Sequence, residues 1–166
     1  MESYHRLQRL FEALAECFAV AFVPRALGNF DQLDGLILPD ATRELAAAAA
    51  RSGVPCYAVL PPAASPIAVG QAPIRFEDCP SLPPVLRNRS VQEWEERDVI
   101  PLRPEAGEQV MASKAGHALW LHRPGPGNGV HLVSTAPPPL GASAFLSEYF
   151  NGQRFIALLP VIHFLR

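Results

Sequence analysis

The amino-acid sequence predicts an α/β fold, a three-layer sandwich with a mainly parallel central sheet and one short antiparallel hairpin near residues 117–134. Two apolar runs, Leu36–Leu38 and residues 54–60, are continuous rather than alternating, which is typical of strands covered on both faces. Between them lies an alanine-rich helical segment at residues 42–51. A strand, a helix and a strand in this order form a β-α-β unit, whose right-handed crossover places the two strands parallel in one sheet.

Both ends of the expected helix carry residues that suit its termini. Asp40 or Thr42 can cap the first turn, and Glu44 lies where a negative charge favours the helix dipole. The five alanines that follow Leu45 favour helix and are small enough to pack closely on a sheet. Gly53 suits the left-handed position that follows a helix. These signals predict where the helix of the unit begins and ends.

The composition is that of one globular domain with a sizeable core. The chain has 166 residues, a net charge of −2 and no basic run, so we expect no nucleic-acid partner. Only 18% of the residues are charged, so we expect some apolar surface to face a partner or another part of a longer protein. No apolar run approaches the ~20 residues that cross a bilayer, and the N-terminus lacks the apolar stretch of a signal peptide. We therefore predict a soluble, cytoplasmic protein with no membrane partner.

Outside the β-α-β unit, short apolar segments are separated by stretches that contain proline or glycine. Leu7, Leu10 and Leu14 share one helical face and predict a helix over residues 3–16, and the β-forming residues 18–23 predict a strand. The 18 prolines gather in the middle of the chain, where they favour short strands and turns. We expect short strands at residues 67–69, Ile74–Phe76, 99–102, 109–113, 119–122 and 130–134, turns at 114–116 and 124–129, and a helix at 142–150.

The C-terminal segment 155–165 predicts a strongly apolar last helix that is bent or restarted at Pro160. Its apolar pattern continues to Arg166 without a capping residue or a polar tail. One interpretation is that this helix packs on a protein partner, either a downstream domain that follows this chain or a second copy in a homodimer. The other interpretation is an ordinary core helix.

Two stretches resemble class I glutamine amidotransferase-like proteins. Residues 34–39 (DGLILP) resemble the "DGLILPGG" strand and turn of that family, and residues 53–62 resemble the strand that leads to its nucleophile. Further along, residues 107–112 and 125–133 resemble a pattern of non-catalytic members. The matches cover roughly half of the chain and are not a strict signature. The resemblance implies a flavodoxin-like arrangement of the three layers.

The departures from the family pattern bear on activity. Active members carry a cysteine in a sharp turn at the end of the second strand, where backbone amides stabilise the oxyanion. Leu60 stands at that position here and is followed by Pro61 and Pro62, which lack backbone donors. Cys56 lies at the opposite end of the strand, and His163 is not part of the family's late His-x-Glu pair. The resemblance therefore implies the fold without amidase activity.

Residues 149–155 and 163–166 resemble the segment that precedes a polysaccharide-deacetylase-like domain in some larger bacterial proteins. The leading hypothesis is thus a non-catalytic amidotransferase-like accessory or protein-interaction domain, without a cofactor, attached to a carbohydrate-active catalytic domain. The alternative is a small ligand-binding domain or hydrolase. Its site would be the crevice at the carboxyl ends of the strands, near Asp40, Pro61 and Pro62, because open α/β sheets bind ligands at that edge.

Candidate metal ligands are few. The three cysteines, Cys17, Cys56 and Cys79, form no CxxC pair, and an odd count favours a reducing compartment. His122 and His131 lie on adjacent predicted strands and can face each other, but no third ligand lies nearby in the sequence. We therefore interpret these histidines as structural and expect no metal. The glycine-rich turn at 125–129 lacks the Lys-Ser/Thr pair of a phosphate loop, so we interpret it as a hairpin turn.

Overall fold

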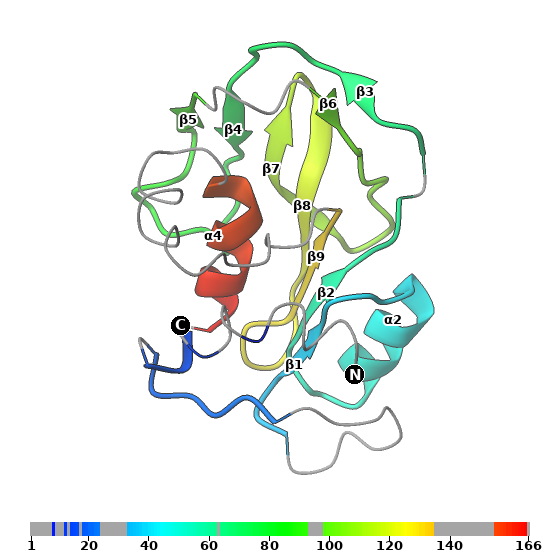
Figure 1. Cartoon of the computed structure of the whole chain (residues 1–166), viewed down its shortest axis with the longest axis vertical. Helices are drawn as coiled ribbons and strands as arrows, with labels where there is room; N and C mark the ends of the chain where they lie inside the picture. Colours follow the sequence, from blue (N-terminus) through cyan, green and yellow to red (C-terminus); the bar gives the residue numbers. More distant parts are fainter. Residues whose placement is uncertain are drawn as a thin grey trace.

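The structure, a computed structural model, describes Gln8, Glu12 and residues 14–16, 18–23, 33–62, 64–92, 98–134 and 155–165. A seven-stranded sheet forms its centre (Figure 1). The spatial order is β1 (Leu36–Leu38), β2 (Cys56–Val59), β9 (Val130–Val133), β8 (His117–Arg123), β7 (Gln109–Lys114), β4 (Ile74–Phe76) and β5 (Ser90–Val91). A separate two-stranded sheet pairs β3 (Ile67–Ala68) with β6 (Asp98–Val99).

The predicted β-α-β unit is confirmed. Strands β1 and β2 are parallel, with Leu36 opposite Cys56, and helix α2 (Arg43–Arg51) connects them. Thr42, rather than Asp40, is the N-cap, because its hydroxyl oxygen accepts a hydrogen bond from the backbone N–H of Leu45 at 3.3 Å. Gly53 follows the helix with a φ of +79°, a conformation that glycine adopts without strain.

The sheet is mixed, so the general α/β class is confirmed and the mainly parallel sheet is wrong. Only the pairings β1–β2 and β2–β9 are parallel, whereas the other four pairings are antiparallel. For β7–β8 and β8–β9, short connections explain the antiparallel pairing, because a parallel pair needs a long crossover between its strands. Strands β7 and β8 are joined by Ala115 and Gly116, whose positive φ values of 49° and 81° suit a two-residue hairpin. The expected hairpin near residues 117–134 is β8 and β9.

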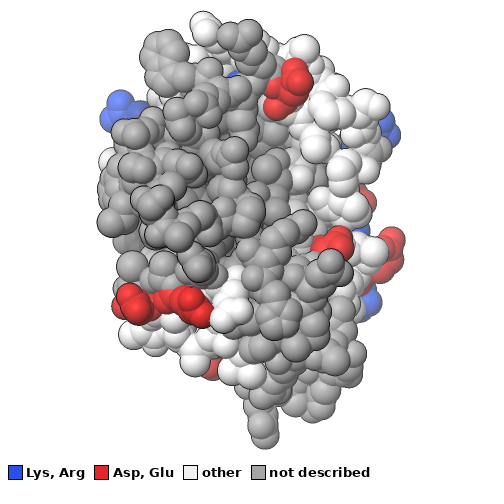
Figure 2. Space-filling view, in the orientation of Figure 1, with Lys and Arg blue, Asp and Glu red and all other residues white. Residues whose placement is uncertain are grey.

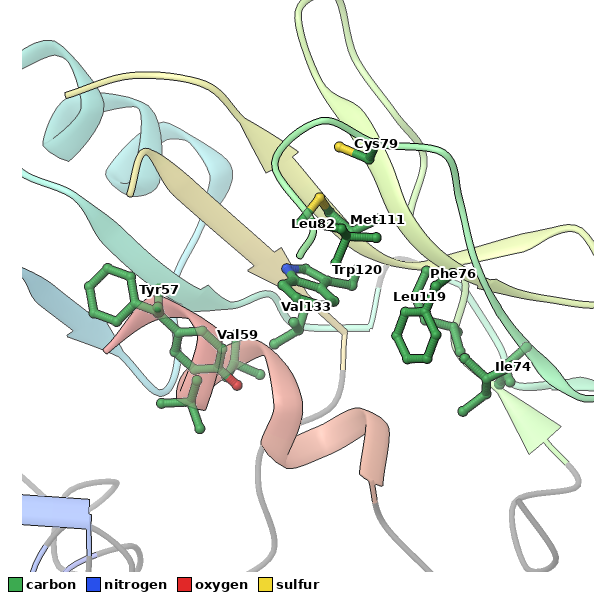
Figure 3. Packing of buried hydrophobic residues seen from close by; sticks show 14 of the residues in the cluster. Tyr57, Val59, Ile74, Phe76, Cys79, Leu82, Met111, Leu119, Trp120 and Val133 are labelled. Atoms are coloured by element: carbon green, nitrogen blue, oxygen red, sulfur yellow. The ribbon is translucent and has the colours of Figure 1, made fainter. Parts of the chain in front are cut away.

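Helices pack on both faces of strand β2, which lies between two clusters of buried side chains. Cys56, Ala58 and Leu60 belong to the cluster that includes α2. Tyr57 and Val59 point to the other face, where they pack with side chains of α4 (Phe155–Phe164). Figure 3 shows the side chains of this second cluster beside α4. The alternation follows from the strand period of two and places one helix on each side of the sheet at this point.

The N-terminal strand predicted at residues 18–23 is wrong. Phe18 is helical, Ala19 is in a turn with a φ of 52°, and residues 20–23 form no strand. Phe18 and Phe22 pack against the same cluster as buried Leu14, so tertiary packing has overridden the local β-propensity. The predicted helix over residues 3–16 is helical at Gln8, Glu12 and 14–16, and its other residues lie outside the described part, as does the predicted helix at 142–150.

Helix α4 is continuous through Pro160 and is not restarted there. Val161 and Phe164 are buried against the sheet, and the described side chains at 159–165 are all buried or half-buried. This helix therefore contributes directly to the core of the domain. None of the helices formed by the described residues has the length and apolar character needed to span a bilayer.

The packing of α4 predicts a large loss of stability when its main contact is removed. Phe164→Ala should lower the free energy of unfolding by about 3–5 kcal/mol, because a largely buried aromatic ring is lost and leaves a cavity. Urea denaturation checks this, with Val85→Ala, a site 72% exposed, as a control that should stay within about 0.5 kcal/mol. Equal effects of the two substitutions would show that α4 does not stabilise the core.

Candidate functional site

The carboxyl ends of β1 and β2 meet at one edge of the sheet, as the predicted strand-end site requires. The backbone N–H of Ala41 donates to the carbonyl of Val59 at 3.0 Å, which holds the turn after β1 beside the end of β2. Asp40, Pro61 and Pro62 are all exposed there. The structure therefore brings the predicted residues to the same edge, but the two cavities described below are lined by other residues.

The position expected for a nucleophile is structural. Leu60 is buried in the α2-side cluster, and its backbone N–H donates to the carbonyl of Val133 at 2.8 Å. Cys56 lies at the start of β2 with none of its surface exposed, and burial raises the pKa of its thiol to about 12. A thiol that stays protonated at neutral pH is a poor nucleophile, so Cys56 has the features of a core residue.

Three histidines and a tryptophan meet on the α4 face of the sheet. His122 and His131 are direct partners across β8 and β9, and their ring centroids lie 4.6 Å apart. His163 of α4 approaches the His131 ring to 5.4 Å, and Trp120 approaches the His163 ring to 5.5 Å. The predicted facing of His122 and His131 is confirmed. His163 was missed, because its partners lie more than thirty positions away in the sequence.

Hydrogen bonds define the tautomers in this histidine cluster. The Trp120 indole N–H donates to His131 Nδ1 at 3.1 Å, so His131 carries its proton on Nε2. His122 Nε2 donates to the carbonyl of Asn128 at 2.9 Å, which leaves Nδ1 as an acceptor. Among the described residues, His131 Nε2 and His122 Nδ1 are buried and have no hydrogen-bond partner. Asn128 in turn donates through Nδ2 to the carbonyl of Phe164 at 2.7 Å and ties the hairpin turn to α4.

Burial favours the neutral form of His131 and His122. Desolvation lowers the pKa of His131 well below its ordinary value, and the neighbouring His122 and His163 lower it further. Desolvation also lowers the pKa of His122, against the opposing effect of the Asn128 carbonyl. Within the described part of the chain, no three His, Cys, Asp or Glu side chains are arranged to hold a metal ion. The cluster thus forms a contact between the hairpin and α4 in which His122 and His131 have lowered pKa values.

A second polar group lies on the opposite face, around the carboxylate of Glu108. This side chain is 1% exposed and accepts from Arg43 Nη1 at 2.7 and 2.9 Å and from Arg123 Nη2 at 3.2 Å. Arg43 also donates through Nη2 to the carbonyl of Arg103 at 2.6 Å. The network joins α2, the segment before β7 and the end of β8. Charge spacing in the sequence did not reveal it, because Arg43 and Glu108 are 65 positions apart.

Two adjoining cavities lie along α2. The larger has a volume of about 280 Å³ and lies between α2 and the turn from β8 to β9. The smaller, of about 190 Å³, contains the Glu108 network. On the face shown in Figure 2, the described Lys, Arg, Asp and Glu side chains lie around the margin. The walls of the two cavities carry three arginines and three glutamates, namely Arg43, Arg51, Arg123, Glu44, Glu105 and Glu108.

Comparisons with protein-family models, curated proteins and solved structures found no significant match to this chain. The resemblance to amidotransferase-like proteins therefore stays a hypothesis that depends on the residues of the β-α-β unit and its continuation.

The histidine cluster predicts acid sensitivity. The unfolded chain binds a proton at His131 near pH 6.5, whereas the folded chain resists doing so, so the free energy of unfolding should fall as the pH drops below 6.5. The slope contributed by one such group is at most about 1.4 kcal/mol per pH unit. Urea denaturation from pH 8 to pH 5 measures it. His131→Gln should flatten the profile, and His117→Gln, at the half-buried start of the same hairpin, should not. Identical slopes in all three proteins would contradict this role of His131.

The Glu108 network predicts that replacing Glu108 lowers stability much more than replacing the neighbouring Glu105. Glu108→Gln should destabilise the fold by about 3 kcal/mol, because it leaves Arg43 and Arg123 without their buried counter-charge. Glu105→Gln is the matched control, since its side chain is 57% exposed and its ion pairs are longer, so its effect should be below about 1 kcal/mol. Thermal unfolding at low and high salt checks both. A loss from Glu108→Gln no larger than that of the control would rule out a structural role for the network.

Proposed function

We propose that this chain is a non-catalytic accessory domain of the glutamine amidotransferase-like type, which acts by binding rather than by chemistry. The observation that carries the proposal is the buried Leu60, followed by the exposed Pro61 and Pro62, at the end of β2. An amidase needs a nucleophile and free backbone donors at this point. Here the side chain is an aliphatic core residue, its backbone N–H is bonded to β9, and the next two residues are prolines that lack an N–H.

The other thiols and imidazoles support the same proposal. Cys56 is buried at the far end of the strand with a raised pKa. His122 and His131 are buried, and His131 is engaged with Trp120, so neither is presented to solvent as a general base. The partner that we propose is a carbohydrate-active catalytic domain, on the basis of the resemblance of residues 149–155 and 163–166. The buried position of Val161 and Phe164 favours an attachment outside the sheet-facing side of α4.

If the domain is non-catalytic, as we propose, the purified chain should not hydrolyse amides or activated esters. Ammonia release from glutamine and asparagine, and nitrophenol release from p-nitrophenyl acetate, should match the buffer rate. Cys56→Ala should leave these rates unchanged, because its thiol is protonated and buried. Turnover above buffer that disappears in Cys56→Ala would overturn the proposal.

The proposed partner has its own test, which is the reading frame beyond Arg166. A carbohydrate-active domain encoded there supports the accessory role, and a stop codon directly after Arg166 removes the support for a covalently attached partner.

A further inference from the structure

The larger cavity beside α2 has mostly apolar walls and two positively charged residues. Its floor and sides come from small and apolar residues of α2, β9 and the turn from β8 to β9. Arg51 and Arg123 are the charged residues among those that line it, and none of the lining residues is acidic. The lining residues are Ala47, Ala50, Arg51, Val54, Arg123, Pro124, Gly125, Pro126, Gly129 and Val130. This lining complements a molecule with an apolar body and a negative charge.

The Arg123 guanidinium is held in place by the protein itself. Its Nη2 donates to the buried Glu108 carboxylate at 3.2 Å, and Glu105 lies 3.9 Å away on the side of the smaller cavity. Among the described residues, no hydrogen bond uses Nε or Nη1 of Arg123, so two donors remain for a ligand. A guanidinium with a fixed orientation binds a carboxylate at a smaller entropic cost than a freely rotating one.

The opposite wall is the glycine turn, whose position is fixed by close contacts. Gly129 has a φ of +67°, and a Cβ atom there would lie 2.5 Å from the carbonyl oxygen of Arg123. A Cβ at Gly127, which has a φ of +58°, would lie 2.9 Å from Pro55 Cγ. Only glycine allows the turn to lie this close to β8 and β2. The cavity is therefore bounded by a helix and a tightly packed turn.

We propose that this cavity binds a small organic acid, with the carboxylate paired to Arg123 and Arg51 and the apolar body packed against Ala47, Ala50 and Val54. A volume of about 280 Å³ is just below the range of roughly 300 to 1,000 Å³ that is typical of ligand sites, so a small molecule fits better than a peptide. The site lies on the α2 face and at the amino end of β2, away from Leu60. Its occupation does not depend on whether the domain has lost catalysis, and the amidase assay can fail independently of it.

Phenylacetate and hexanoate are the probes, titrated into the ¹⁵N-labelled full chain and followed by NMR. Both acids should shift the amide signals of residues 47–54 and of the non-proline residues in 123–130 in a saturable way. Phenylacetamide, which has the same apolar body without the charge, should bind at least tenfold more weakly, as should inorganic phosphate, which has charge without an apolar body. Equal binding of phenylacetamide or of phosphate would overturn the proposal, and so would tighter binding of a peptide with an apolar C-terminal residue.

Three variants test the residues. Arg51→Gln, at an exposed position, and Arg123→Gln should each weaken phenylacetate binding at least tenfold. Ala47→Leu should abolish it by filling the cavity while keeping a good helix former in α2. Arg75→Gln, an exposed arginine on β4, is the control and should bind like the original chain. If Arg123→Gln fails to fold, the other two variants decide the question, and unchanged affinity in Arg51→Gln and Ala47→Leu would overturn the site.

Discussion

Strand β9 holds the two halves of this protein together, and the rest of the structure depends on its pairing. On one side it runs parallel to β2, and on the other it runs antiparallel to β8. All four of its side chains are buried. Beyond the strand ladder, the Cys56 N–H donates to the Gly129 carbonyl at 2.9 Å and the Leu60 N–H donates to the Val133 carbonyl at 2.8 Å. The β-α-β unit and the antiparallel strands thus share one sheet because β9 pairs with both.

The register of the β8–β9 hairpin also determines which polar side chains lie on each face of the sheet. Because side chains alternate along a strand, His122 and His131 point to the α4 face, whereas Arg123 and Val130 line the cavity on the α2 face. The glycine turn between the strands has contacts on both sides of the sheet. Asn128 within it accepts from His122 and donates to the end of α4, and its glycines form a wall of the cavity. One register therefore determines both the neutral histidine contact and the position of the arginine that we propose binds a carboxylate.

Local sequence signals predicted much of this arrangement. The β-α-β unit follows from two continuous apolar runs and an alanine-rich helix, whose Gly53 terminus and two candidate caps, Asp40 and Thr42, were identifiable by residue type. The hairpins follow from glycine-rich turns between β-forming runs, and the facing of His122 and His131 follows from the hairpin register. The prediction failed at residues 18–23, where a β-forming composition is outweighed by the packing of Phe18 and Phe22 on the core. It failed again for the sheet as a whole, because the connections from β7 to β8 and from β8 to β9 are too short for parallel crossovers.

The sequence by itself determined helix α2 with its glycine terminus, the strands of the β-α-β unit and the hairpin turns, because these depend on backbone preferences of neighbouring residues. It also determined that Leu60 occupies the place of a nucleophile in the resemblance to amidotransferase-like proteins. Only the tertiary structure decided that His163 joins the other two histidines, that Glu108 pairs with Arg43, and that α2 and the glycine turn enclose a cavity. Those contacts join segments distant in sequence, and they form only when β9 inserts between β2 and β8. Burial then gives them their chemistry, because neutral imidazoles and a shielded carboxylate arise from exclusion of water.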